Sequence, residues 1–294
     1  MLPVSVVMST YNRENTIKEA IDSILNQSFC DFEFIIVDDA STDSTEKIIK
    51  SYDDDRILYL KNHKNCGCSF NYHVCHNIAK GKYVVHIDDD DISFKERIAK
   101  QVDFMEENPD IALSGTYIET FGENKRPSWV FYYDPKILNI IMNFYNPICH
   151  SSVIYRKSYL DKHFINYDVR KKCSQDYDLY KQIVLSGGKI ANLPEILTKY
   201  RMHKNRITDV KDTQNIQIDV ANEIKKELLR RFFNEEQIVE FKEYMRGFPY
   251  NEYGIYSVIK GLEMLKQAQS ARGEDCSEEI KRLIEDVKNK KFIF

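Results

Sequence analysis

Residues Val4–Ser28, VSVVMSTYNRENTIKEAIDSILNQS, contain in order the signals of a β-strand, a polar loop and an α-helix. The opening VSVVMST is mostly β-branched or apolar, which favours a strand. After the polar YNREN, apolar side chains recur at helical spacing, at Ile17, Ile21, Ile24 and Leu25. A strand that leads through a short loop into a helix is the repeating unit of α/β domains. The stretch therefore predicts an α/β fold if the unit recurs along the chain.

The unit does recur in the next part of the chain. FEFIIVDD, residues 32–39, and RILYLKN, residues 56–62, are strand-like, and each is followed by a helical pattern. KYVVHI, residues 82–87, is a fourth strand signal and leads to a helical stretch at residues 94–110. This alternation predicts a mostly parallel, Rossmann-like sheet flanked by helices, with ligands bound beyond the carboxyl ends of its strands.

Weaker signals follow in the second half of the chain: a strand at 111–122, a strand at 151–160, a helix at 174–188 and a strand pair at 189–203. We expect the α/β domain to span residues 1–208. Beyond it the strand signal disappears and charged helical patterns dominate. Residues 209–294 are therefore predicted to form a helical C-terminal region.

The composition is that of an ordinary globular protein, with 43% hydrophobic and 30% charged residues among 294, enough for one sizeable core. With 42 basic and 46 acidic residues the net charge is −4, and the absence of a basic block argues against nucleic acid as a partner. No apolar run approaches the roughly 20 residues that span a bilayer, and the first residues do not resemble a signal peptide. We expect a soluble, cytoplasmic protein, and seven cysteines without regular spacing fit such a reducing compartment.

Six side chains that can bind zinc lie within one short segment: His63, Cys66, Cys68, His73, Cys75 and His76. Structural zinc sites use spaced pairs such as C-x-x-C. This segment instead has C-x-C followed by a helical pattern, which would point the ligands in several directions. We expect free thiols here rather than a zinc site.

The run HIDDDDIS, His86–Ser93, places four carboxylates directly after the fourth strand. Carboxylate oxygens on the rim of a sheet are suitable ligands for a hard divalent cation. A structural alternative is the start of a helix near Phe94, which Asp91 or Ser93 could cap. Spacing alone leaves both interpretations open.

Four motifs in a fixed order are more specific than the carboxylate run alone. They are VSVVMSTYNRENTIKEAIDSILNQS, FEFIIVDDASTDST, GKYVVHIDDDDIS and SQDYDLYKQIVLSGG, and together they resemble glycosyltransferase family 2 over roughly residues 3–206. The resemblance implies the GT-A fold and an inverting transfer of sugar from a nucleotide-sugar donor. It also implies that Asp88 and Asp90 hold Mn²⁺ or Mg²⁺ against the donor diphosphate.

The resemblance further implies a set of nucleotide-binding residues: Thr10, Tyr11, Arg13, Asp38, Asp39, Asp88 and Asp89. Within this set Asp38 or Asp39 would recognise the base, and Asp88 would lie nearest the ribose. A carboxylate can accept an N–H from uracil, so a UDP-sugar is the leading donor, although guanine also offers N–H donors. Asp38 and Asp39 have a structural alternative, because either could cap the helix that follows.

On the acceptor side, the resemblance implies that Asp176 in SQDYDL is the catalytic base that takes the proton of the acceptor hydroxyl. Without the resemblance, we would interpret Asp176 as an ordinary acidic residue in the exposed first turn of a helix. Gln175 stands where the family usually has glutamate, so acceptor contacts can differ.

Three further residues match the family on the diphosphate or acceptor side: His150, Arg201 and His203. A cation or imidazole there would offset charge on the leaving group. Tyr72-His73 stands where the family commonly has Arg-Asn, which removes a cation from the nucleotide side and leaves the donor less certain.

The predicted function is transfer of a sugar from a nucleotide-sugar to a hydroxyl of a glycan or lipid-linked saccharide. A nucleotidyltransferase that makes a nucleotide-sugar is the main alternative enzyme, but a Gly-rich loop with a lysine would favour it and STYNREN has neither. A non-catalytic partner protein that binds nucleotide-sugars is the alternative from another class. Apolar residues in FFNEEQIVEFKEYM and KNKKFIF can pack within the chain itself, as such amphipathic stretches usually do. The alternatives are contacts with the inner face of the membrane or with a second copy of the chain.

Overall fold

The computed structural model describes residues 3–123, 132–203, 211–245, 252–273 and 276–289. The chain divides into two compact units. The first comprises Met1–Phe131 and Ile148–Val220, and the second comprises Tyr132–Pro147 and Ala221–Phe294. These two units are groups of residues that lie close together, and such a grouping does not show which parts fold independently. The expected domain boundary at residue 208 therefore stays a proposal.

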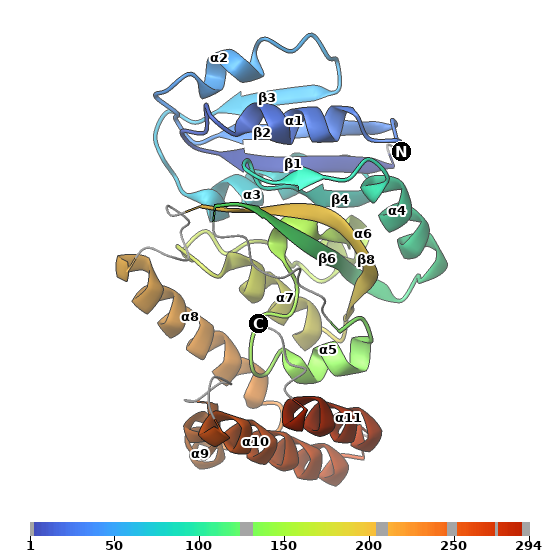
Figure 1. Ribbon diagram of the computed structural model, residues 1–294, viewed down its shortest axis with the longest axis vertical. Coiled ribbons are helices and arrows are strands. Elements are labelled where there is room, and N and C mark those ends of the chain that lie inside the picture. Colours follow the sequence, from blue (N-terminus) through green and yellow to red (C-terminus); the bar gives the residue numbers. More distant parts are fainter. Residues whose placement is uncertain (1–2, 124–131, 204–210, 246–251, 274–275, 290–294) are drawn as a thin grey trace. The chain divides into compact units, whose positions relative to one another are not determined.

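The first unit contains a mixed sheet whose first half is parallel, as the alternating pattern predicts. Its strands are β1 (Val4–Thr10), β2 (Phe32–Asp38), β3 (Ile57–Lys61) and β4 (Tyr83–His86). Figure 1 shows β1 between β2 and β4, and β3 pairs with the far side of β2. All four run the same way, so their carboxyl ends share one edge of the sheet.

The second half of the sheet includes antiparallel pairs. Its strands are β5 (Ile92–Ser93), β6 (Ile111–Gly122), β7 (Ile154–Arg156) and β8 (Lys189–Met202). Strand β7 pairs antiparallel with β4 and β6, β5 pairs antiparallel with β8, and β6 and β8 are parallel. The full order within the described residues is β3-β2-β1-β4-β7-β6-β8-β5.

Two expectations for the second half are corrected. The strand expected over 151–160 ends at Arg156, because the helix α6 (Lys157–Lys162) begins immediately after it. The strand pair expected over 189–203 is one strand, β8, with an irregular register opposite Thr116 and Tyr117. Pro194 lies at this irregularity, and proline cannot donate the N–H that a regular ladder needs.

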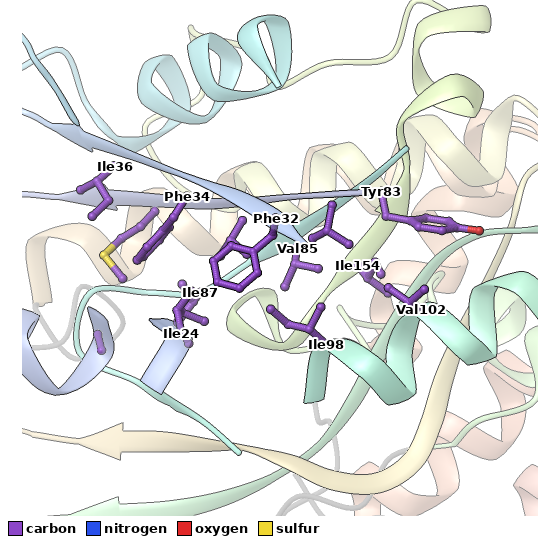
Figure 2. Close-up of a cluster of buried hydrophobic side chains, with 14 of the residues drawn as sticks. Ile24, Phe32, Phe34, Ile36, Tyr83, Val85, Ile87, Ile98, Val102 and Ile154 are labelled. Atoms are coloured by element: carbon purple, nitrogen blue, oxygen red, sulfur yellow. The ribbon is translucent and has the colours of Figure 1, made fainter. Parts of the chain in front are cut away.

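Helices of the first unit follow from the apolar spacing. They are α1 (Ile17–Leu25), α2 (Thr45–Ile49), α3 (Cys68–Ile78), α4 (Arg97–Glu107), α6 and α7 (Gln175–Leu185), with a short 3₁₀ helix η1 (His150–Ser152). Ile24 of α1 and Ile98 of α4 belong to one buried cluster with Phe34 and Val85 of the sheet (Figure 2). Because side chains alternate along a strand, His86 faces away from that cluster, toward the face that carries Tyr72 of α3.

The second unit is helical. It contains α5 (Pro135–Ile141), the end of α8 (Lys211–Leu229), α9 (Glu235–Met245), α10 (Glu252–Ala271) and α11 (Ser277–Lys288). Its buried cluster joins Ile141 of α5 to Phe241 of α9 and Leu283 of α11. Helix α5 begins with a capping signal, since the carboxylate of Asp134 accepts hydrogen bonds from the N–H groups of Lys136 and Ile137.

Among the described residues, the helices are all too short or too polar to cross a bilayer. The apolar residues Ile238 and Phe241 of FFNEEQIVEFKEYM are buried within the second unit, whereas Val239 is exposed. The last five residues of KNKKFIF lie outside the described residues.

Candidate active site

The carboxyl ends of β1, β2 and β4 bring three polar segments together. Thr10 at the end of β1 lies opposite Asp38 in the sheet register, and Val7 lies opposite His86. The N–H of Asp39 donates to the carbonyl of Thr10 at 2.8 Å. The residues after each strand therefore share one rim, as the parallel arrangement requires.

The loop after β1 is attached to the loop after β2 by backbone and side-chain hydrogen bonds. Asn12 adopts a left-handed conformation with φ of 52°, which asparagine tolerates better than most residues. Its side-chain oxygen accepts from the N–H of Thr42 at 2.8 Å, and its own N–H donates to Oγ of Ser41 at 2.9 Å. The N–H of Arg13 donates to Oγ1 of Thr45 at 2.7 Å. This attachment leaves the Tyr11 side chain 43% exposed at the rim, while Thr10 is buried.

Asp38 and Asp39 have different surroundings. The buried carboxylate of Asp38 accepts from the N–H of Ser41 and from the hydroxyl of Tyr59, both at 2.7 Å. Both of its oxygens thus serve the local structure. The helix α2 is instead preceded by Ser44, so neither aspartate is its N-cap residue.

Asp39 organises the entrance to α3. It accepts from the N–H groups of Cys66 and Gly67 and from the Asn62 side chain, each at 2.8 Å. Asn62 also donates to the buried Asn71 of α3 at 2.7 Å. The Asp39 carboxylate is therefore fixed in place at the rim before any ligand binds.

The four consecutive aspartates point in different directions. Oδ1 of Asp88 accepts from the hydroxyl of Tyr72 at 3.1 Å and lies 3.7 Å from Nδ1 of His150. Although burial opposes it, the contact with His150 lowers the pKa of Asp88. Asp88 is therefore held as an anion on the face of the sheet that carries α3.

Asp89 and Arg13 form an ion pair, with Nε of Arg13 3.1 Å from Oδ1 of Asp89. The N–H of Tyr11 also donates to Asp89, at 3.3 Å. Burial and the neighbouring Asp90 raise the pKa of Asp89 to about 7, against the opposing charge of Arg13. Asp89 thus joins the loop after β1 to the carboxylate run.

Asp90 and Asp91 contact the end of β8. Nε2 of His203 lies 2.9 Å from Oδ2 of Asp90, and the guanidinium of Arg201 donates to the Asp90 carbonyl at 2.7 Å. Asp91 is fully buried, and burial together with Asp90 raises its pKa well above the ordinary value. The structure therefore brings Arg201 and His203 to the carboxylate run.

Asp88 and Asp90 fit a hard divalent cation in their chemistry. Each side chain is partly exposed, by 32% and 17% respectively. The bonds found in the described part of the chain engage Oδ1 of Asp88 and Oδ2 of Asp90, which leaves one oxygen of each for a ligand. No group of three or more His, Cys, Asp or Glu side chains in the described part could hold a metal by itself, the His63–His76 segment included. The donor diphosphate and water would have to complete the coordination.

His150 interacts electrostatically with a donor-side and an acceptor-side carboxylate. Asp88 raises the pKa of His150, although burial opposes this. Asp176, at the start of α7, acts on His150 as a second negative charge. Burial raises the pKa of Asp176 itself, and His150 partly counteracts the effect. The candidate base and the candidate donor-binding carboxylate are therefore electrostatic neighbours.

Sequence reasoning missed the buried rings behind these carboxylates. Tyr167 lies with its hydroxyl 3.1 Å from Nε2 of His150 and 2.9 Å from Nε2 of His86. Tyr72 packs against His86 and His150 with ring centroids 4.6 and 4.9 Å away. The sequence did show that Tyr72 replaces the arginine common in the family. It did not show the ring partners of Tyr72, because these lie far from it in the sequence.

Comparison with known proteins shows the family of the chain. The model of glycosyl transferase family 2 matches residues 5–164, which is more than half of the chain. The protein belongs to glycosyl transferase family 2. The predicted enzyme class, a glycosyltransferase, is confirmed by this match and by named relatives.

Two curated relatives cover most of this glycosyltransferase. An uncharacterized glycosyltransferase of Methanocaldococcus jannaschii is 36% identical over 206 residues, spanning 68% of this chain and 70% of the relative. The UDP-Glc:alpha-D-GlcNAc-diphosphoundecaprenol beta-1,3-glucosyltransferase WfaP of Escherichia coli is 31% identical over 207 residues, spanning 70% of this chain and 79% of WfaP.

Solved structures confirm the GT-A fold of this glycosyltransferase. TarS 1-349 of S. aureus, in complex with UDP-GlcNAc, superposes with a TM-score of 0.64 at 18% identity, covering 98% of this chain and 92% of that one. The mannosyltransferase PcManGT of Pyrobaculum calidifontis, in complex with GDP-Man and Mn²⁺, gives a TM-score of 0.61 at 13% identity, covering 98% and 80%.

Proposed function

We propose that this glycosyltransferase is an inverting, metal-dependent enzyme with Asp176 as its general base. It would transfer a sugar from a nucleotide-sugar, with a UDP-sugar as the leading donor, to a hydroxyl of a glycan or lipid-linked saccharide. The single observation that supports this most strongly is the position of His150. It lies 3.7 Å from Asp88 on the donor side and interacts electrostatically with Asp176 on the acceptor side.

The proposed binding of the donor is argued from the residues at the rim of the sheet. Thr10, Tyr11 and Arg13 would line the nucleotide site, with the base near Asp39. Asp38 remains the alternative, because both carboxylates are buried and each already accepts hydrogen bonds on both oxygens. A carboxylate accepts the N–H of uracil or of guanine. The structures of TarS with UDP-GlcNAc and of PcManGT with GDP-Man illustrate both donors in distant relatives.

Asp88 and Asp90 would hold Mn²⁺ or Mg²⁺, whose chemistry is to neutralise the charge that develops on the departing diphosphate. Arg201 and His203 lie next to Asp90 and could offset the same charge. Asp89 remains paired with Arg13 and would hold this arginine in position at the nucleotide site.

The proposed activation of the acceptor depends on Asp176. The acceptor hydroxyl oxygen would attack the anomeric carbon as the bond from that carbon to the diphosphate oxygen breaks. Asp176 would take the hydroxyl proton, and the nucleoside diphosphate would leave with the electron pair of the broken bond. A raised pKa suits a base that works near neutral pH. One displacement from the opposite side inverts the configuration at the anomeric carbon.

The acceptor class is supported by WfaP, whose name specifies a diphosphoundecaprenol-linked acceptor. A lipid-linked acceptor would bring the enzyme to the inner face of the membrane. The alternatives of a nucleotidyltransferase and a non-catalytic binding protein predict different products. The first would form a nucleotide-sugar, and the second would form no product at all.

The proposal is tested by thermal shift with UDP-, GDP- and dTDP-sugars, each with Mn²⁺ and with chelator. Selective, metal-dependent stabilisation by one sugar nucleotide identifies the nucleotide base of the donor. A ligand that binds only the folded state raises the melting temperature of the protein. Transfer from the stabilising donor to a lipid-linked saccharide is then measured by product mass. Stabilisation without transfer or donor hydrolysis would favour the binding protein.

A further inference from the structure

Four buried rings form a cluster behind the candidate donor and acceptor carboxylates. Tyr72 comes from α3, His86 from the end of β4, His150 from η1, and Tyr167 from the segment between α6 and α7. Their centroids are 4.4 to 6.0 Å apart in every pair. We refer to these four residues as the ring cluster. The cluster joins four separate segments next to Asp88, whose carboxylate lies 3.7 Å from Nδ1 of His150.

The hydroxyl of Tyr167 bridges the two imidazoles of the ring cluster. It lies 3.1 Å from Nε2 of His150 and 2.9 Å from Nε2 of His86. Burial raises the pKa of Tyr167 well above its ordinary value, so the phenol keeps its proton. A phenol carries one proton, and it therefore donates to one imidazole and accepts from the other.

The direction of this chain follows from its two ends. At one end Nδ1 of His150 faces the Asp88 carboxylate, which can only accept, so this nitrogen carries a proton. At the other end Nδ1 of His86 is buried without a partner in the described residues. A buried N–H without an acceptor is rarer than an unpaired acceptor. The proton of neutral His86 therefore belongs on Nε2, where it donates to Tyr167.

We propose that Tyr167 is a positioning residue for sugar transfer, because its hydroxyl fixes the imidazole of His150 beside Asp88. With His150 neutral, two hydrogen bonds run in one direction, from His86 Nε2–H to Tyr167 and from Tyr167 to Nε2 of His150. The Nδ1–H of His150 then faces the Asp88 carboxylate at 3.7 Å. This inference rests on the proposed function for its kinetic consequence, whereas the hydrogen-bond chain can be tested without any substrate.

Tyr155 offers a matched control. Tyr155 is buried like Tyr167, and the centroid of its ring lies 6.0 Å from that of His86. Its hydroxyl bonds to His76 at 3.2 Å and not to His150. Tyr167→Phe and Tyr155→Phe each remove one buried hydroxyl and keep the ring, so both variants should fold with similar falls in melting temperature.

The kinetic test is single-turnover transfer by the full chain, beside donor affinity by calorimetry. Tyr167→Phe should slow transfer by about 10- to 100-fold, a fraction of what a direct proton acceptor contributes. Donor affinity should stay within about threefold, because the Tyr167 hydroxyl bonds to His86 and His150 and not directly to a candidate nucleotide-binding residue. Tyr155→Phe should transfer at close to the wild-type rate. Equal rates in the two variants would overturn the positioning role.

The second test uses ¹⁵N NMR of histidine-labelled protein at about pH 9, above the ordinary range of imidazole titration. His86 should be protonated on Nε2 and His150 on Nδ1, so that the two rings show opposite tautomers. The His86 signature should be lost in Tyr167→Phe and kept in Tyr155→Phe. The same tautomer on both rings would contradict the bridge. If the wild type transferred no sugar, the proposed function would fail while this spectrum still decided the hydrogen-bond chain.

Discussion

The backbone N–H of Arg201 donates a hydrogen bond to Oδ1 of Asp91 at 2.7 Å, across 110 positions of sequence. The neighbouring Asp90 instead directs its carboxylate toward His203. Adjacent aspartates therefore have different roles. Asp91 anchors the end of β8 to the sheet, and Asp90 faces the candidate cation site.

Asp90→Ala should abolish metal-dependent donor binding, because the loss of one of two hard protein ligands leaves an octahedral ion poorly held. Calorimetry with a UDP-sugar, in Mn²⁺ and in chelator, measures this. Asp91→Asn is the matched control, since an amide keeps an oxygen for Arg201 and imitates the neutral carboxyl that its raised pKa favours. Undiminished wild-type activity in chelator would remove the metal assignment.

Asp39→Ala should weaken nucleotide binding by at least tenfold, since the base loses its candidate acceptor. The structure adds a second consequence, because Asp39 also satisfies the N–H groups of Cys66 and Gly67. Leaving these partly buried donors unpaired costs up to about 1–3 kcal/mol, which urea unfolding will detect. Asp38→Ala should lose a similar amount of stability through Ser41 and Tyr59, yet retain nucleotide affinity once folded. Equal affinity losses in both variants would place base recognition elsewhere.

Asp176→Asn should keep donor and metal binding near wild type, because the amide is nearly isosteric and lies on the acceptor side. Transfer should fall by roughly 10²–10⁴-fold, the usual contribution of a positioned general base. Single-turnover transfer at saturating donor is the measurement. A rate within a few-fold of wild type would mean that another residue takes the proton. Asp178, which already pairs with Lys181 at 2.8 Å, would be tested next.

His76 should make the folded state less stable in acid. Burial and nearby Lys157 lower its pKa from 6.5 to about 4, so between these values the unfolded chain binds more protons. Stability should therefore rise with pH across this window, by ~3 kcal/mol for a shift of this size. His76→Gln removes the titration and should flatten that part of the curve. Urea unfolding at several pH values compares the two proteins, and equal slopes would contradict the lowered pKa.

The parallel half of the sheet was predictable because each strand and its helix lie next to each other in sequence. The run of β1, α1 and β2 follows from local spacing, and so does the meeting of Thr10, Asp38 and Asp88 at one rim. The short strand β7 was less visible, because Ile154–Arg156 pairs antiparallel with strands far from it in sequence. The expected strand also ran on into α6, where no proline or glycine marks the change.

The candidate site shows the same limit. The family resemblance predicted the types of residue at the rim, and the structure brings Arg201 and His203 to Asp90. Tyr167 and His86 could not be foreseen, since a buried tyrosine or histidine has no local signature and their contacts span 81 positions. The roles of all these residues stay predictions until the variants are measured.

Helix α5 is synthesised well before the helices that cover its apolar face. Tyr132–Pro147 belongs to the unit that otherwise begins at Ala221, about 80 residues later in the chain. At typical translation speeds of roughly 5–20 residues per second, Ile137, Ile140 and Ile141 stay without their native partners for several seconds. Holdase chaperones bind segments of this kind, so the yield of folded enzyme should depend on chaperone supply during synthesis. A fragment that stops near residue 208 would keep that face uncovered permanently and should aggregate.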